Sequence, residues 1–274
     1  IDQSQLRHGG KAVSTADVAA INDAGGDQEV EHDTVSRTAT MGIAWAPDED
    51  WGLRLLVPWL DRGHSTYASA TNPVAPDQLS TARIKGLGDV RFLVTWQGLM
   101  EEHQLGLQLG LKLPTGDYGG PAADGSVIVG RHPTAFQHGP LAASASPENL
   151  VDASLQPGTG STDVILGAYW HQPVGTDVEA FASAQFQAAV ASRLHGPGRD
   201  FRVGNTTFVS VGARWQATPS VVPQLQVNFS HKSADQGALA DGADSEGTVV
   251  YLSPGIGGVL GEHWQAFGFV QLPV

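Results

Sequence analysis

The chain has 274 residues, of which 41% are hydrophobic and only 16% are charged, and its formal charge is −13. Such an acidic chain repels nucleic acid phosphates, so DNA and RNA are excluded as expected partners. The chain has no cysteine, which excludes disulfide frameworks and thiolate metal sites. Glycine accounts for 34 residues, about 12% where about 7% is usual, and this excess disfavours a helical bundle.

Membrane helices are excluded by the length of the apolar runs. A transmembrane helix needs about 18 consecutive apolar residues, and the longest candidate here, Leu53–Leu60, is interrupted by Arg54 and Pro58. The opening residues Ile1–Gln3 carry neither the basic nor the apolar stretch of a signal peptide. We therefore expect that any signal peptide has been removed or was never there.

The first 34 residues show no regular alternation. Ser14 and Asp17 have the spacing of a capping box and predict a short helix through Ala19, Ala20 and Ile21. An acidic run follows at 27–33. We expect residues 1–34 to form an N-terminal arm or an extracellular loop, and residues 35–274 to form a separate β domain.

From residue 35 onward, apolar and polar residues alternate in segments of about ten residues, a pattern typical of transmembrane β-strands. In Gln104–Leu113, leucine occupies every odd position, and glycine or a polar residue occupies every even one. Each such segment predicts a strand with one apolar face. The others, in chain order, are Trp51–Trp59, Val90–Trp96, Val164–Trp170, Val178–Phe186, Thr207–Trp215 and Leu225–Phe229.

The predicted connections alternate between short turns and long loops rich in Gly, Ser, Asp and Pro. This is the plan of an outer-membrane barrel, which has short periplasmic turns and long extracellular loops. We expect short turns at 46–50, 98–102, 172–176, 217–220 and 261–263, and long loops at 61–86, 115–160, 191–202 and 232–247.

Most tryptophans lie beside a predicted short turn, and only Trp59 lies toward the loop end. Tryptophan prefers the membrane interface, where its rings meet acyl chains and its N–H meets water. We therefore predict a periplasmic aromatic girdle, although the same rings could cap the core of a soluble β protein. The girdle residues are Trp45, Trp51, Trp96, Trp170, Trp215 and Trp264.

If the apolar faces meet lipid, the opposite faces line the lumen. Aromatic rings there can stack on a flat solute, and arginines can bind a carboxylate or phenolate. Alternatively, the charges pair with one another in a structural network. Small inward residues such as Gly106 and Gly212 leave room. The predicted lumen residues are Arg54, Asp89, Arg91, Lys112, Asp163, Tyr169, Glu179, Phe181, Phe208 and Arg214.

No catalytic triad is visible in the sequence. Ser161, Asp163 and His171 share a face, but Asp163 and His171 are eight residues apart, about 26 Å along a strand. Ser230 and His231 are neighbours, so they point to opposite faces. We expect that the protein is not an enzyme and that it uses no cofactor or metal.

Several short motifs, in the same order, resemble the outer-membrane family named for the meta-pathway of phenol degradation, whose members are described as candidate transporters. The resemblance runs from Trp45 to Val274 and implies a barrel of about twelve strands that takes up or exports small, often aromatic, compounds. It places 271–274 at the penultimate strand. The motifs are Trp51–Trp59, Gly86–Val90, Gly110–Gly116, Leu155–Asp163 and Val250–Gly255.

Together these patterns predict an all-β protein, an up-and-down antiparallel transmembrane β-barrel of about 10–12 strands in the bacterial outer membrane. Its expected partners are outer-membrane lipid, lipopolysaccharide and a small-molecule solute, aromatic compounds among the candidates, that passes through it. The alternative is a non-conducting structural barrel that scaffolds a protein partner at the cell surface. A soluble all-β protein is the third possibility.

Overall fold

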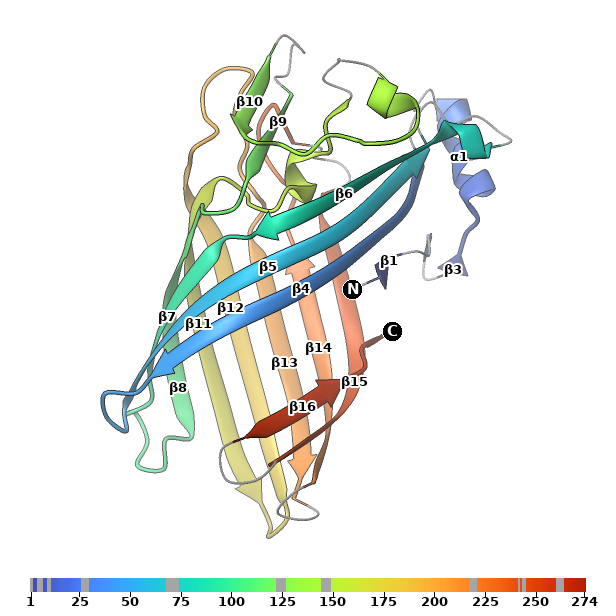
Figure 1. The fold of residues 1–274 in the computed structure, drawn as a ribbon. Coiled ribbons are helices and arrows are strands. Elements are labelled where there is room, and N and C mark those ends of the chain that lie inside the picture. The colour runs from blue at the N-terminus through green and yellow to red at the C-terminus, as the bar shows by residue number, and fades with distance from the viewer. Residues whose placement is uncertain are drawn as a thin grey trace.

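Antiparallel strands form most of the regular structure in the computed structural model, and its described residues include one α-helix (Figure 1). None of the helices it describes is long and apolar enough to cross a membrane. The structure describes residues 2–3, 7–8, 11–25, 30–67, 74–121, 127–143, 149–216, 221–240, 242, 245–259 and 264–274.

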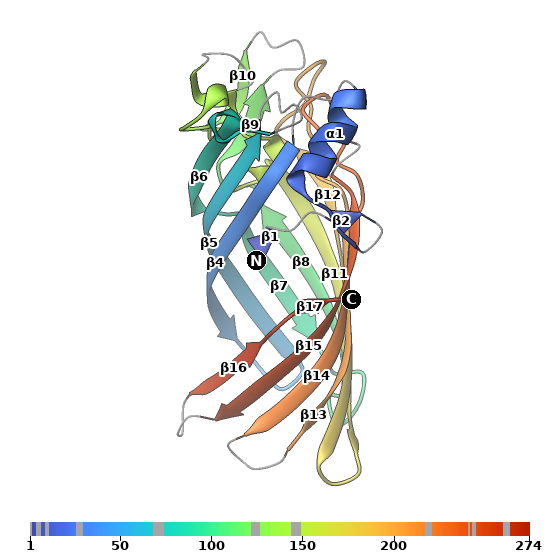
Figure 2. The same ribbon diagram turned by 90° about the vertical axis from the view of Figure 1, so that its right-hand side faces the viewer.

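One sheet dominates the fold and curls around a long axis (Figure 2). Each strand of its main path pairs with its neighbour in antiparallel register, so the topology is up and down. The predicted fold class is confirmed. The path from β4 has ten strands: β4 (Val30–Trp45), β5 (Trp51–Tyr67), β7 (Val90–Trp96), β8 (Leu105–Leu113), β11 (Ser161–Val174), β12 (Val178–Ser192), β13 (Thr206–Trp215), β14 (Val222–Lys232), β15 (Gly247–Val259) and β16 (Gln265–Phe269).

Short strands extend this sheet at both ends. β1 (Asp2–Gln3) pairs with β4, and β17 (Leu272–Pro273) pairs with β15. β5 is long enough to pair with β7 near the turns and with β6 (Leu79–Leu87) near the loops. The expectation of a loop over 61–86 is therefore wrong for most of its length. Both faces of 61–67 carry polar residues, so this part of β5 shows no apolar alternation.

The apolar residues form continuous rows across one face of the sheet. Val94 lies opposite Leu109, Leu109 opposite Leu166, and Leu166 opposite Phe186. These side chains face outward, and Leu109 is 57% exposed. A row of this kind is unfavourable in water but favourable against acyl chains, so the outward face is the lipid face.

The predicted short turns at 46–50 and 98–102 are confirmed, and the turn expected at 172–176 lies at 175–177 because β11 continues to Val174. The turns expected at 217–220 and 261–263 lie outside the described residues. Short connections therefore join the strands at one end of the barrel, which we call the turn end; the opposite end is the loop end.

The N-terminal helix α1 (Thr15–Gly25) is confirmed, together with its capping box. The Ser14 hydroxyl accepts the Asp17 backbone N–H at 3.1 Å and donates to the Asp17 carboxylate at 2.6 Å. The latter bond holds the pKa of Asp17 below its usual value. A two-strand ribbon, β2 (Arg7–His8) and β3 (Lys11–Ala12), precedes the helix. β4 begins at Val30, within the segment assigned to the arm, and residues 27–29 of the acidic run lie outside the described residues.

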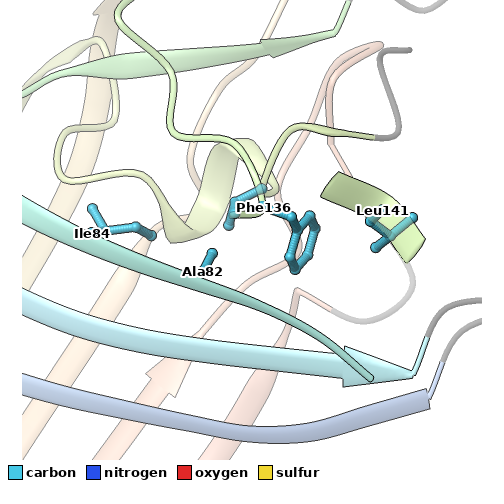
Figure 3. Close-up of a cluster of buried hydrophobic side chains, with 5 residues drawn as sticks. Ala82, Ile84, Phe136 and Leu141 are labelled. Carbon is cyan, nitrogen blue, oxygen red and sulfur yellow. The ribbon is translucent and has the colours of Figure 1, made fainter. Parts of the chain in front are cut away.

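The long loops pack on one another at the loop end. Ala82 and Ile84 on the inward face of β6 are covered by Phe136, Leu141 and Val151 (Figure 3). A second buried cluster joins two loops through Tyr118, Ala153, Leu194 and Phe201, and Leu239 of a third loop packs against it. We call this folded layer the cap; it includes β9 (Tyr118–Pro121), β10 (Ile128–Arg131), η2 (Pro140–Ala143) and η4 (Ala153–Leu155), while η1 (Pro76–Gln78) precedes β6.

The assignment of faces predicts opposite effects for neighbouring residues of β8. Leu109→Arg places a charge in the lipid and should lower the free energy of unfolding by about 2–4 kcal/mol. Gln108 points into the lumen, so Gln108→Arg should lower the free energy of unfolding by only about 1 kcal/mol, the contribution of the lost Gln185–Gln108 hydrogen bond. Urea titration of the protein in lipid vesicles measures both, and equal destabilisation would contradict the assignment.

Candidate solute path

The predicted lumen residues lie on the inward side of the sheet. Register places Arg91 opposite Lys112 and Lys112 opposite Asp163, while Glu179 lies opposite Arg214. Asp89 lies between β6 and β7, and its carboxylate reaches Lys112. These residues occupy different levels of the barrel and differ in what they contact. The remaining positions are Arg54, Tyr169, Phe181 and Phe208.

A buried ion cluster lies below the cap. Lys112 Nζ is 2.9 Å from Asp89 Oδ2 and 3.1 Å from Asp163 Oδ2, and all three side chains are at least nine-tenths buried. One cation therefore faces two carboxylates. Hydrogen bonds to Asp163 from Ser161 and Gln187, both 2.6 Å long, stabilise the excess negative charge.

The same cluster fastens the ends of the longest loop to the barrel wall. The Asp89 carboxylate accepts the backbone N–H of Gly116 at 3.1 Å and that of Thr159 at 3.0 Å. The Thr159 hydroxyl also contacts Lys112. Asp89, Lys112 and Asp163 therefore bind one another and the cap. This arrangement agrees with the alternative in which the lumen charges form a structural network. A passing solute has little access to them.

Near the turn end, Arg214 pairs with Glu179, and His171 Nδ1 lies 3.7 Å from the same carboxylate. The ring of His171 stacks on that of Tyr169, with centroids 6.5 Å apart. The Tyr169 hydroxyl donates to the side chain of Gln97, a partner that the sequence analysis did not identify. These contacts hold the tyrosine ring in place.

A cavity of about 340 Å³ opens on the inward face between these levels. Gln185 donates to Gln108 at 3.0 Å along its wall. It is lined by Gln108, Ala168, Tyr169, Ser183, Ala184, Gln185 and Phe208. A polar wall with two aromatic rings suits a small molecule that has a flat apolar body and a polar group.

Glycines lie opposite two aromatic residues of the inward face. The Tyr169 ring lies over Gly106, where an added Cβ would come within 2.3 Å of it. Phe181 lies over Gly212 in the same way, at 2.7 Å. Because the glycines have no side chain, the rings lie against the wall rather than across the lumen.

Arg54 and Arg91 differ from the other lumen charges because both are exposed and neither forms an ion pair within the described residues. Arg54 lies opposite Leu93, and Arg91 is two residues along the same strand. Such a diagonal pair has its backbones about 7–8 Å apart, within reach of one bound anion. These two cations are available to a solute.

The six tryptophans of the predicted girdle lie toward the turn end. Trp51 and Trp96 are cross-strand neighbours with ring centroids 6.2 Å apart, whereas Trp59 lies farther toward the loop end, just before the row that contains Asp61. Their role as an interfacial girdle stays a prediction. The exposed members are Trp45, Trp51, Trp170, Trp215 and Trp264, and Trp96 is half-buried.

The described residues contain no group of three or more His, Cys, Asp or Glu side chains that could hold a metal. Ser161 and Asp163 belong to the Lys112 cluster, whereas His171 faces Glu179 near the turn end. The serine, aspartate and histidine that share a strand face therefore do not form a catalytic triad.

Comparisons with known proteins support the fold. No protein-family model matches the chain, and no curated protein matches it. The chain is similar to the crystal structure of an outer membrane channel from Pseudomonas putida F1, with a TM-score of 0.58 and 12% identity over 99% of this chain and 84% of the channel. It also matches a FadL homologue from Pseudomonas aeruginosa, with a TM-score of 0.42 and 11% identity over 89% of this chain and 61% of that one.

Replacing Lys112 by Met tests the structural role of the buried cluster. The variant leaves Asp89 and Asp163 facing each other without a cation, which should lower the free energy of unfolding by about 3–5 kcal/mol. Heat-dependent mobility on SDS gels measures the loss. Adding Asp163→Asn to this variant should restore part of the stability, and no recovery would contradict the pairing.

Proposed function

We propose that this protein is an outer-membrane channel through which small molecules, aromatic acids among them, diffuse. The apolar outward face and the similarity in fold to an outer membrane channel support a location in the outer membrane. The polar inward face supports passage of solutes rather than lipid. The link to phenol degradation stays a prediction from sequence resemblance.

One observation carries this proposal: a cavity beside two aromatic rings, in a lumen that also presents two arginines with no ion pair to any described residue. The rings of Tyr169 and Phe208 offer flat contact surface, and Arg54 and Arg91 offer positive charge. A carboxylate that binds an arginine gains charge-assisted, often bidentate hydrogen bonds. The combination favours a planar organic anion as the solute.

The charge of the path can be tested in planar bilayers. The wild-type chain should show discrete openings that prefer anions and are blocked by benzoate. Replacing Arg54 and Arg91 by Ala should shift the reversal potential toward cation selectivity and weaken benzoate block by roughly tenfold or more, since each hydrogen bond to a charged group contributes about 1.5–3 kcal/mol.

Arg199→Ala is the control, because it makes the same arginine-to-alanine change once, at an exposed position in a loop. It should leave both readouts near the wild-type values. Unchanged selectivity in the Arg54 and Arg91 double variant would remove these residues from the path.

The alternative, a non-conducting scaffold, is favoured by the cap, whose two buried clusters cover part of the loop end. A chain that inserts correctly but gives no openings would favour this alternative. A chain that conducts only after residues of the cap are deleted would instead indicate a gated channel.

A further inference from the structure

The outward face of the main sheet carries its basic residues in one place. Among the described strands of that sheet, the outward-facing Lys and Arg side chains are Arg37 on β4 and Arg83 and Lys85 on β6. The other Lys and Arg residues of these strands face inward, including Arg54, Arg91, Lys112 and Arg214. We call Arg37, Arg83 and Lys85 the basic patch.

The basic patch lies at a defined level of the membrane. Trp59 on β5 is opposite Ala39 and Leu87, which form the last apolar row toward the loop end. The next outward row contains Arg37, Asp61 and Lys85, and Arg83 lies one row further. The first charges beyond an interfacial tryptophan meet lipid headgroups rather than acyl chains.

The carboxylate of Asp61 interacts with all three cations. Arg83 donates two hydrogen bonds to Asp61, at 2.9 and 2.8 Å, and Lys85 Nζ lies 3.8 Å from the same group. Arg37 also interacts electrostatically with it. Three positive charges and one negative charge leave a net charge of +2 on an otherwise acidic chain. Arg83 and Lys85 remain about half exposed.

The turn end has the opposite character, because its described turns are acidic. Asp48, Glu49 and Asp50 occupy one turn, and Glu101 and Glu102 occupy the next. Cations at one membrane surface and carboxylates at the other distinguish the two leaflets. In an outer-membrane barrel the long loops face the cell exterior, so the basic patch lies in the outer leaflet.

We propose that the basic patch binds the phosphate groups of lipopolysaccharide in the outer leaflet. Arginine and lysine bind phosphate through charge-assisted hydrogen bonds, and each basic residue near an anionic surface contributes about 1 kcal/mol, roughly a fivefold gain in affinity. This site lies outside the barrel and does not depend on conduction through the lumen.

Native mass spectrometry of the full chain in detergent tests the site with rough lipopolysaccharide as the probe. The informative variant is Arg37→Gln with Lys85→Gln, because it removes two charges and leaves the pair of Arg83 and Asp61 intact. Binding should weaken by roughly 30-fold. Circular dichroism and heat-dependent gel mobility check that the barrel is folded.

Arg131→Gln is the matched control. Arg131 is also a half-exposed arginine paired with an aspartate, Asp117, but it lies in the cap. It should bind lipopolysaccharide like the wild type. An equal loss in this control, or no loss in the double variant, would overturn the proposal.

Three further probes identify the source of the phosphate. Dephosphorylated lipopolysaccharide, phosphatidylglycerol and inorganic phosphate should each bind at least tenfold more weakly than the phosphorylated glycolipid. Equal binding of phosphatidylglycerol would indicate a general site for anionic lipids. Equal competition by inorganic phosphate would indicate a free-anion site, and either result would overturn the assignment to lipopolysaccharide.

Discussion

Backbone N–H and C=O groups have no water to bind within a bilayer, so they must form hydrogen bonds with the neighbouring strands. This constraint fixes the register from β5 to β15, and the register fixes the direction of every side chain. A slip of one residue would turn the leucines of β8 into the lumen and Gln108 into the lipid. The apolar band, the polar lumen and the basic patch all depend on this pairing.

Within the lumen, some charged side chains are buried and others are exposed. Beneath the cap, Lys112 forms ion pairs with two carboxylates and stabilises the fold. Arg54 and Arg91 have no carboxylate partner among the described residues, and both are exposed. The alternation of side chains along each strand places buried and exposed charges on the same face but cannot distinguish them. Burial depends on loop residues such as Thr159 that are distant along the chain.

Much of the fold follows from the sequence, since alternation over about ten residues depends on local chemistry. The strand around Leu109 and the capping box at Ser14 are examples. Prediction fails at residues 61–67, where ion pairs and loop contacts replace lipid, so that neither face is apolar. The cavity could not be predicted either, because its lining residues come from four strands, β8, β11, β12 and β13, that are distant along the chain.

Asp89 holds Gly116 and Thr159 together, so the chain between them begins and ends at one point on the barrel rim. Loop closure costs little more free energy as a loop lengthens. Insertions, deletions or whole replacements between these anchors can therefore change the outer surface while β8 and β11 keep their register. Such variation is limited where this segment packs in the cap, as Phe136 and Val151 do over Ala82 and Ile84.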